Sequence, residues 1–373
     1  MLSKEIIELR HLLHRYPELS CQEEKTRETL IRFLRLHTDL RIVPREGWFY
    51  AVYQSEAAEK RPPIAFRADM DALPMEEGLA LPYASRHRGV AHKCGHDGHA
   101  AALAGFGCQL SALRPDRDVY LIFQHGEEIG AGGEMCSQLI REKGIGEVYA
   151  CHNWSGFPLG QILVRAGTAQ CASQGLLIRL QGRPSHASQP EDGVNPCSAL
   201  AELALWVQAQ TGDWSESNRV SPVLATIVGM NAGGRNFGMS ASSGELAITL
   251  RAEKQAELEG FRKRTMERAA ELASAHSLLV SFENLDVFPE TACEEVSVEK
   301  VRRAARSLGL ACQPLKRPFR ASEDFGYYLR QCPGAIFYVG NGTEYPEIHT
   351  GEYDFPDANL EVIIKMFSAL CAE

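Results

Sequence analysis

Apolar residues recur at helical spacing over residues 4–16 and 22–37, which predicts a pair of helices at the start of the chain. Further along, short and continuously apolar runs predict buried strands, and Ala-rich stretches between them predict helices. The strands are expected at 64–66, 119–123, 148–150 and 335–339, and the helices near 99–113 and 131–143. Buried strands that alternate with helices favour an α/β fold whose central sheet is mostly parallel, with flanking helices.

The middle of the chain has a different pattern, strand-helix-strand-strand-helix-strand, which is typical of a ferredoxin-like α/β domain. The strands are expected at 176–180, 223–230, 245–250 and 278–282, and the helices at 194–211 and 254–276. We therefore expect residues 172–284 to form an inserted domain. Residues 1–171 and 285–373 would together form a discontinuous first domain.

Composition and charge limit the partners and the cellular location expected for this protein. The 373 residues are 45% hydrophobic and carry a net charge of -9, which argues against nucleic acid and anionic membranes as partners. The amphipathic start lacks the apolar centre of a signal peptide, and no stretch has the length and apolarity of a bilayer-spanning segment. The 11 cysteines are irregularly spaced and do not read as a disulfide framework, so a reducing cytoplasm is the expected location.

Metal-capable side chains follow the predicted strands at the points where these strands end. They are Asp69 and Asp71, Glu127 and Glu128, His152, and, after a short loop, His349. In an open parallel sheet the ligand crevice lies outside the carboxyl ends of the strands, so these residues are expected to converge. Each one alone would more often be structural, and it is their joint placement that favours a site.

The densest group of metal-capable residues is the run at 92–99, HKCGHDGH. Thiolate, imidazole and carboxylate groups are good ligands for zinc-like ions. Cys94 and His96 lie two residues apart, so both would point to one side of an extended segment. Glu127 and Glu128 would point opposite ways on an extended strand, which suits one for a metal and the other for proton transfer to and from a water molecule.

At this point the chain resembles the dimetal aminoacylase and carboxypeptidase family, and within it the amidohydrolase branch of hippurate hydrolases, indole-acetyl-amino-acid hydrolases and N-acetyl-diaminopimelate deacetylases. Six ordered motifs carry the resemblance over nearly the whole chain. They are FRADMDALP at 66–74, KCGHDGH at 93–99, FQHGEE at 123–128, GRPSHA at 182–187, ASEDF at 321–325 and HTGEY at 349–353.

The resemblance implies two divalent metal ions and hydrolysis of an amide bond in an N-acyl amino acid or dipeptide. The implied metal ligands are Cys94, His96, Glu128, His152 and His349. Zinc is the expected metal, with manganese, cobalt or nickel as alternatives. Glu127 would be the general base and acid, and Asp71 would orient a ligand.

In similar enzymes a histidine of the inserted domain reaches across a homodimer to stabilise the oxyanion, a role that falls here to His186. The inserted domain would then be both lid and dimer interface. Asn236 and Arg251 match residues that contact the substrate carboxylate.

The sequence departs from the family pattern in two places. Relatives usually have Gln-Pro-Ala-Glu-Glu where residues 124–128 read QHGEE, and Asn-Val-Ile-Pro after a Gly-Gly pair where residues 233–240 read GGRNFGMS. The first change leaves both glutamates intact, so activity is expected. The second change leaves the identity of the substrate undetermined.

Three alternatives compete with an amidohydrolase. The first is a dipeptidase or carboxypeptidase with the same metal site. The second is a binding protein that keeps the fold without catalysis, which the presence of Glu127 and all ligands disfavours. The third is a thiol enzyme with Cys94 as nucleophile and a nearby histidine as base.

Overall fold

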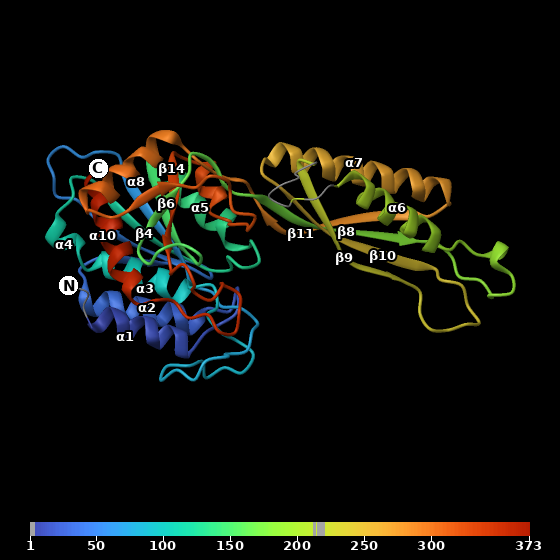
Figure 1. The fold of residues 1–373 in the computed structure, drawn as a ribbon, viewed down its shortest axis with the longest axis horizontal. Helices are drawn as coiled ribbons and strands as arrows, with labels where there is room; N and C mark the ends of the chain where they lie inside the picture. The colour runs from blue at the N-terminus through green and yellow to red at the C-terminus, as the bar shows by residue number, and fades with distance from the viewer. Residues whose placement is uncertain (1–3, 212–213, 215–220) are drawn as a thin grey trace. The chain divides into compact units, whose positions relative to one another are not determined.

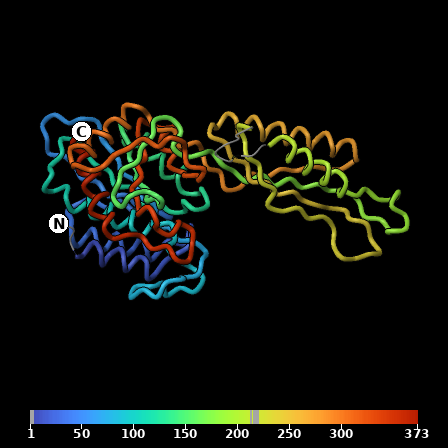
Figure 2. The backbone as a smooth tube through the Cα atoms, viewed as in Figure 1, coloured from blue at the N-terminus to red at the C-terminus, as the bar shows by residue number. Residues whose placement is uncertain are grey.

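The computed structural model describes residues 4–211, 214 and 221–373. These residues divide into two compact units (Figure 1). The first unit contains residues up to 169, 291–318 and from 324 onward, and the second contains 170–290 and 319–323. The backbone trace in Figure 2 shows that the N-terminal and C-terminal parts of the chain belong to the same unit. The predicted inserted segment, 172–284, falls within the second unit.

The first unit is built on an eight-stranded mixed sheet. Its strands, in spatial order, are β1 (Arg41–Pro44), β2 (Phe49–Tyr53), β4 (Val119–Gln124), β3 (Ile64–Asp69), β5 (Glu147–Trp154), β14 (Gly334–Gly340), β6 (Ile162–Val164) and β13 (Cys312–Pro314). The four central strands β4, β3, β5 and β14 pair in parallel. Antiparallel pairs join β1 to β2, β2 to β4 and β14 to β6, and the edge strand β13 pairs with β6 in parallel. A separate two-stranded sheet pairs β7 (Gly167–Gln170) with β12 (Thr291–Cys293).

The central strands are apolar because both faces of the sheet are covered. Every residue of β3, β4 and β14 is buried, the burial expected of parallel strands with helices on both sides. The predicted α/β fold with a mostly parallel central sheet is confirmed by this topology. The strands extend further than their apolar runs, so that Asp69 is the last residue of β3 and His152 lies inside β5 rather than beyond it.

Helices flank this sheet. Those of the first unit are α1 (Lys4–Arg15), α2 (Glu24–His37), α3 (His96–Gly107), α4 (Leu110–Leu113), α5 (Gly132–Lys143), α8 (Glu295–Ser307), α9 (Gly326–Leu329) and α10 (Ala358–Ala372). Helix α3 is buried along its whole length and contacts α1, α2 and α10 as well as β3. Its glycines permit this close packing, since a Cβ on Gly98 would lie 2.5 Å from the Phe355 ring. The first turn of α3 carries His96, one of the predicted metal ligands.

The second unit has a four-stranded antiparallel sheet in the order β11 (Leu279–Phe288), β8 (Ala172–Gln181), β10 (Ser243–Ala252), β9 (Val223–Ala232). Two helices, α6 (Cys197–Gln210) and α7 (Gln255–Ala275), cover one face of this sheet (Figure 1), and a short 3-10 helix spans Pro190–Asp192. The strand order and connections match the predicted ferredoxin-like pattern. Helix α7 packs on the sheet because its buried residues recur at helical spacing.

Among the described residues, none of the helices combines the length and the apolarity that a bilayer crossing requires.

Candidate metal centre

A sharp backbone bend at the start of α3 brings Cys94 and His96 together. Gly95 lies between them with φ +106, a left-handed conformation that favours glycine. A Cβ at this position would also lie 2.2 Å from Oδ1 of Asn153. His96 is already the first residue of α3, so the expected extended segment is wrong. The two side chains converge because of the bend rather than through strand alternation.

His152 reaches the same point from β5. Its Nδ1 lies 2.8 Å from the backbone carbonyl of Asn153, and its Nε2 lies 3.4 Å from Sγ of Cys94. A hydrogen bond from Nδ1 to that carbonyl leaves the lone pair on Nε2 facing the thiol. The side-chain ligand atoms of Cys94, His96 and His152 all lie within 4.8 Å of one another.

The two glutamates lie in a turn between β4 and α5 and not on an extended strand. Oε2 of Glu127 is 3.9 Å from Nε2 of His96, and Oε1 of Glu128 is 3.8 Å from the same nitrogen. The expectation that the two side chains point opposite ways is therefore wrong. The turn directs both carboxylates toward His96.

His349 comes from the loop between β14 and α10 and is exposed. Its backbone N–H donates to the carbonyl of Lys93 at 2.7 Å, which ties its loop to the Cys94 segment. Its Nε2 lies 3.6 Å from Oε2 of Glu128. The backbone of His349 has φ +62, a strained conformation for a residue with a side chain and one that recurs at functional sites.

Asp71 lies directly behind this group. Its Oδ1 is 3.1 Å from Nδ1 of His96, so that Nε2 of the same ring faces the centre of the cluster. Its Oδ2 accepts the hydroxyl of Ser20 at 2.7 Å and the backbone N–H of Glu128 at 3.0 Å. One buried carboxylate thus orients two of the predicted ligands, as expected of an outer partner in a metal site.

A second buried hydrogen-bond network lies beside the cluster and is centred on His99, a residue to which the sequence had given no role. Nδ1 of His99 lies 2.7 Å from Oδ1 of Asp69, and Nε2 of the same ring lies 2.7 Å from Oδ1 of Asn153. Oδ2 of Asp69 accepts from Arg67 at 2.7 Å. The spacing of His96 and His99 by three residues would have placed both on one face of a helix. His99 and Arg67 thus hold the Asp69 carboxylate in place.

Two buried atoms at the centre of the cluster lack hydrogen-bond partners among the described residues. They are Nε2 of His96 and Oε1 of Glu128, which face each other across 3.8 Å. Unpaired polar atoms in a protein interior are costly unless something binds them. The surrounding donors, a sulfur, imidazole nitrogens and carboxylate oxygens, are those that zinc-like ions prefer. The residues present therefore fit divalent metal ions.

The electrostatics of the cluster match this fit. Burial raises the pKa of Glu128 to about 7 although His96 opposes the shift, and burial raises the pKa of the Cys94 thiol well above its usual range. Burial alone would lower the pKa of His96, but Asp69 and Cys94 raise it well above its usual range. A cation at the centre would favour the charged carboxylate and the thiolate, reversing the shifts that burial imposes.

The structure thus brings together seven of the predicted site residues: Cys94, His96, Glu127, Glu128, His152, His349 and Asp71. The other three, His186, Asn236 and Arg251, belong to the second unit. Within that unit, Nδ1 of His186 lies 2.7 Å from the Ser188 hydroxyl, and Oδ1 of Asn236 accepts the N–H of Gly238 at 3.0 Å. Arg251 donates to the Ser322 hydroxyl at 2.6 Å.

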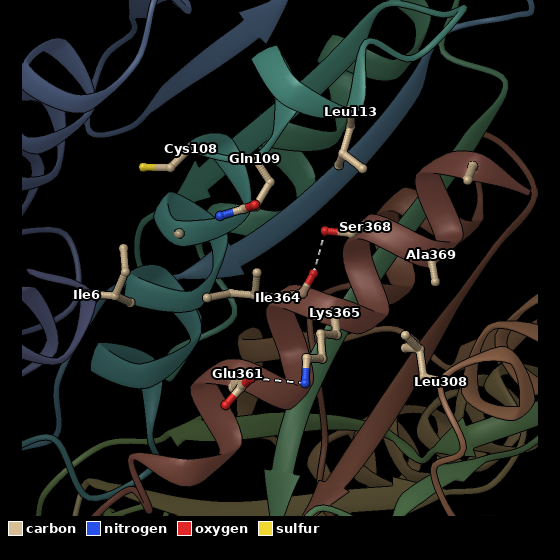
Figure 3. Close-up of a pocket in the computed structure, with 12 residues that line it drawn as sticks. Ile6, Cys108, Gln109, Leu113, Leu308, Glu361, Ile364, Lys365, Ser368 and Ala369 are labelled. Atoms are coloured by element: carbon tan, nitrogen blue, oxygen red, sulfur yellow. Dashed lines mark hydrogen bonds and ion pairs between the residues drawn. The ribbon is translucent and has the colours of Figure 1, made fainter. Parts of the chain in front are cut away.

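A different cavity, of about 450 Å³, lies between α10 and the segment that joins α3 to α4 (Figure 3). Its lining is mostly apolar, with Ile364 and Leu113 among the labelled side chains. Among the described residues that line it, the one carboxylate belongs to Glu361, which pairs with Lys365 at 3.0 Å (Figure 3). This cavity lacks the convergent ligand atoms of the cluster around His96.

Comparison with known proteins gives a consistent set of similarities. The family model described as peptidase family M20/M25/M40 matches residues 65–373. The chain is 30% identical over 357 residues to N-acetyl-L-cysteine deacetylase of Bacillus subtilis (strain 168), covering 93% of this chain and 83% of that protein. It is 28% identical over 358 residues to N-acetyldiaminopimelate deacetylase of Shouchella clausii (strain KSM-K16), covering 92% of each.

Solved structures are similar over the whole chain. A protein of methicillin resistant Staphylococcus aureus has a TM-score of 0.86 at 25% identity, covering 98% of this chain and 94% of that one. A Bacillus subtilis protein described as a dinuclear metal binding peptidase has a TM-score of 0.81 at 24% identity, covering 99% and 97%. The fold of both units is therefore shared with proteins of known structure.

Proposed function

The chain belongs to peptidase family M20/M25/M40, and we propose that it hydrolyses the amide bond of a small N-acyl amino acid with the aid of two divalent metal ions. The observation that carries the proposal is the convergence of thiol, imidazole and carboxylate groups, from four separate parts of the chain, around the unpaired Nε2 of His96. Relatives that are named deacetylases of N-acetyl amino acids support the substrate class.

The proposed metal ligands are the five predicted from the sequence: Cys94, His96, Glu128, His152 and His349. Their mixture of one sulfur, three imidazoles and one carboxylate favours zinc, while manganese, cobalt and nickel are alternatives. When bound, such ions lower the pKa of a water molecule and polarise the scissile carbonyl group.

A side chain of the protein carries out the proposed proton transfers. Glu127 is the proposed general base, because its carboxylate lies beside the cluster and is only 5% exposed. It takes a proton from the attacking water and passes it to the nitrogen of the leaving amine. Asp71 holds His96 in the orientation that leaves Nε2 free, and so acts through a neighbour rather than on the substrate.

The remaining proposed contacts come from the second unit. His186 is exposed and would stabilise the developing oxyanion, whereas Asn236 and Arg251 would bind the carboxylate of the substrate. Arg251 suits this role because a guanidinium binds carboxylates through two parallel hydrogen bonds. Its side chain is already anchored by Ser322, which would reduce the entropy that binding costs.

We also propose a homodimer that forms through the second unit. Several large apolar side chains are exposed there, and Phe237 is 94% exposed. The others are Leu205, Val228, Met230, Met239, Leu279 and Leu285. Phe237 and Met239 belong to one loop between β9 and β10, and exposed apolar groups that lie close together favour a protein interface. Sedimentation of the wild-type protein and of a Phe237→Asp, Met230→Lys variant tests this: the wild type should sediment as a dimer and the variant as a monomer.

The cytoplasm is the proposed location. All 11 cysteines are free thiols, and six of them are buried, which suits a reducing compartment.

Two experiments separate the alternatives. The first is a hydrolysis screen over N-acetyl amino acids, N-acetylcysteine included, and dipeptides, with added divalent ions and with a chelator. We expect N-acetyl substrates to be preferred and the chelator to abolish turnover. A clear preference for dipeptides would favour a dipeptidase, and turnover that survives the chelator would contradict a metal enzyme.

The second experiment is Cys94→Ser. The pKa of this thiol is raised by burial, which disfavours a free thiolate nucleophile. If Cys94 is a ligand, the variant should contain less metal and lose activity in proportion. Full metal content with no activity would instead favour a thiol mechanism.

A further inference from the structure

The loop between α1 and α2, residues 16–23, is firmly anchored although it has no regular structure. Oε2 of Glu18 accepts both the backbone N–H and the hydroxyl of Thr26, at 2.8 and 3.0 Å. The carbonyl of Glu18 accepts the N–H of Ala72 at 2.8 Å, directly after Asp71. Cys21, at the tip of the bend, has φ +64. These bonds fix the loop against the edge of the candidate site.

Two carboxylates hold the backbone on either side of Glu127. Oε1 of Glu23 accepts the N–H of Gly126 at 2.8 Å, and Oδ2 of Asp71 accepts the N–H of Glu128 at 3.0 Å. The residue before the proposed base and the residue after it are therefore each fixed by a buried acidic side chain. Both acids are tied to the same loop, because Ser20 donates to Asp71 at 2.7 Å.

The turn that these acids hold depends on Gly126. This residue has φ +60, and its carbonyl accepts the N–H groups of Ala131 and Gly132 at 2.9 and 3.3 Å. A Cβ on Gly126 would lie 3.0 Å from Sγ of Cys21. The α1–α2 loop is thus packed directly against the turn, and the Glu23 side chain bonds to the backbone of the turn.

Glu23 is an unusual residue for such a place. Its side chain is 3% exposed, its Oε2 has no hydrogen-bond partner among the described residues, and no described basic group forms an ion pair with it. Burial, followed by the nearby charge of Asp71, raises the pKa of Glu23 to about 7, against the lowering effect of the Gly126 N–H. A buried carboxylate without a cationic partner lowers the stability of a fold, so stability alone does not account for it.

We propose that Glu23 is a positioning residue for catalysis, whose carboxylate fixes the Gly126–Glu128 turn so that Glu127 reaches the reacting water and leaving group. This inference rests on the proposed function, since it takes Glu127 as the general base. Glu23 does not touch substrate or metal and acts only through the backbone that carries Glu127. A small displacement of a catalytic group slows the reaction, and one of about 1 Å lowers the rate roughly 10²-fold.

The test compares three variants of Glu23. Glu23→Met fills similar space and removes the acceptor, whereas Glu23→Gln retains a carbonyl oxygen that accepts from Gly126. We expect Glu23→Met to lower kcat about 10- to 100-fold with KM and metal content near those of the wild type, and Glu23→Gln to restore most of the rate. Glu23→Asp withdraws the carboxylate by one methylene group and should also lower kcat, which keeps the test available if Glu23→Met does not fold.

Glu18→Met is the matched control. It removes two hydrogen bonds from the same loop, but those bonds end on Thr26 and not on the turn. We expect this variant to unfold at a lower temperature and to keep the wild-type kcat per metal-loaded molecule. A purely structural role for Glu23 would make the Glu23 and Glu18 variants behave alike.

Each outcome is decisive. The inference is overturned if Glu23→Met keeps the wild-type kcat, if Glu23→Gln is as slow as Glu23→Met, or if the lost rate follows lost metal or lost folding. Those results, seen alongside an active wild type, leave the proposed function intact. A wild type that hydrolyses no substrate of the screen would remove the proposed function and this inference with it.

Discussion

His14 should make the stability of the protein depend on pH between neutral and alkaline conditions. The residue is fully buried in α1, and both of its ring nitrogens face carboxylates. Nδ1 lies 2.8 Å from Oδ2 of Asp97, and Nε2 lies 2.9 Å from Oε2 of Glu77. Two acceptors require two N–H donors, so the structure selects the doubly protonated, positively charged ring.

The size of this contribution to the free energy of folding follows from the pKa of His14. Burial would lower this pKa and Arg10 opposes the charge, but Asp97 and Glu77 raise it from 6.5 to about 9. A difference of about 2.5 pH units corresponds to about 3 kcal/mol of folding free energy. Because the pKa is raised in the folded state, this stabilisation is fully present below about pH 6.5 and is lost as the pH rises through about 9.

The assay is urea unfolding from about pH 6 to about pH 10, at constant ionic strength, of the wild type and of His14→Gln. A chelator is present throughout, because metal binding itself depends on pH. The comparison cancels the other groups near the ring, which include Asp354 at 3.8 Å and His92 at a ring distance of 6.3 Å. The free energy of unfolding of the wild type should fall by about 3 kcal/mol more than that of the variant. Parallel curves for the two proteins would show that His14 carries no pH-dependent stability.

Three further predictions concern catalysis and the metal centre. Glu127→Gln should keep both metal ions, measured by elemental analysis, and lower kcat about 10²- to 10⁴-fold; wild-type turnover would contradict its role as base. His186→Ala should lower kcat roughly 10²- to 10³-fold with unchanged metal content, and an unaltered rate would remove it from the oxyanion site. Gly95→Ala should lower both the melting temperature and the metal content, because its Cβ would lie 2.2 Å from Oδ1 of Asn153 at φ +106; a fully metal-loaded variant of normal stability would contradict the bend described here.

The centre of the fold could be predicted from the sequence because burial on both faces gives each of its strands an uninterrupted apolar run. Strands β3, β4 and β14 are of this kind. The outer strands β6 and β13 have three residues each, too short to give a pattern that differs from a loop. Helix α8 was also missed, although Val298, Val301 and Ala305 are buried at helical spacing, because charged residues surround these positions.

The residues of the site could be predicted from the sequence, but their arrangement in space could not. His152 does lie beside the Cys94 segment, but from a position inside β5 rather than past its end. The left-handed bend at Gly95 and the turn at Gly126 could not be derived from alternation along a strand, and they decide where His96 and Glu127 point. The role of Glu23 is set by a hydrogen bond across 103 positions of the sequence, which no local pattern encodes.

In the proposed metal centre, residues from 94 to 349 hold two metal ions in one place. Crystals of the protein grown with zinc, with diffraction recorded on both sides of the zinc absorption edge, would show whether this arrangement forms. We expect two anomalous peaks at bonding distance from the side chains of Cys94, His96, Glu128, His152 and His349. Peaks bound by other residues, or no peak near Nε2 of His96 in protein that is active with zinc, would contradict the claim.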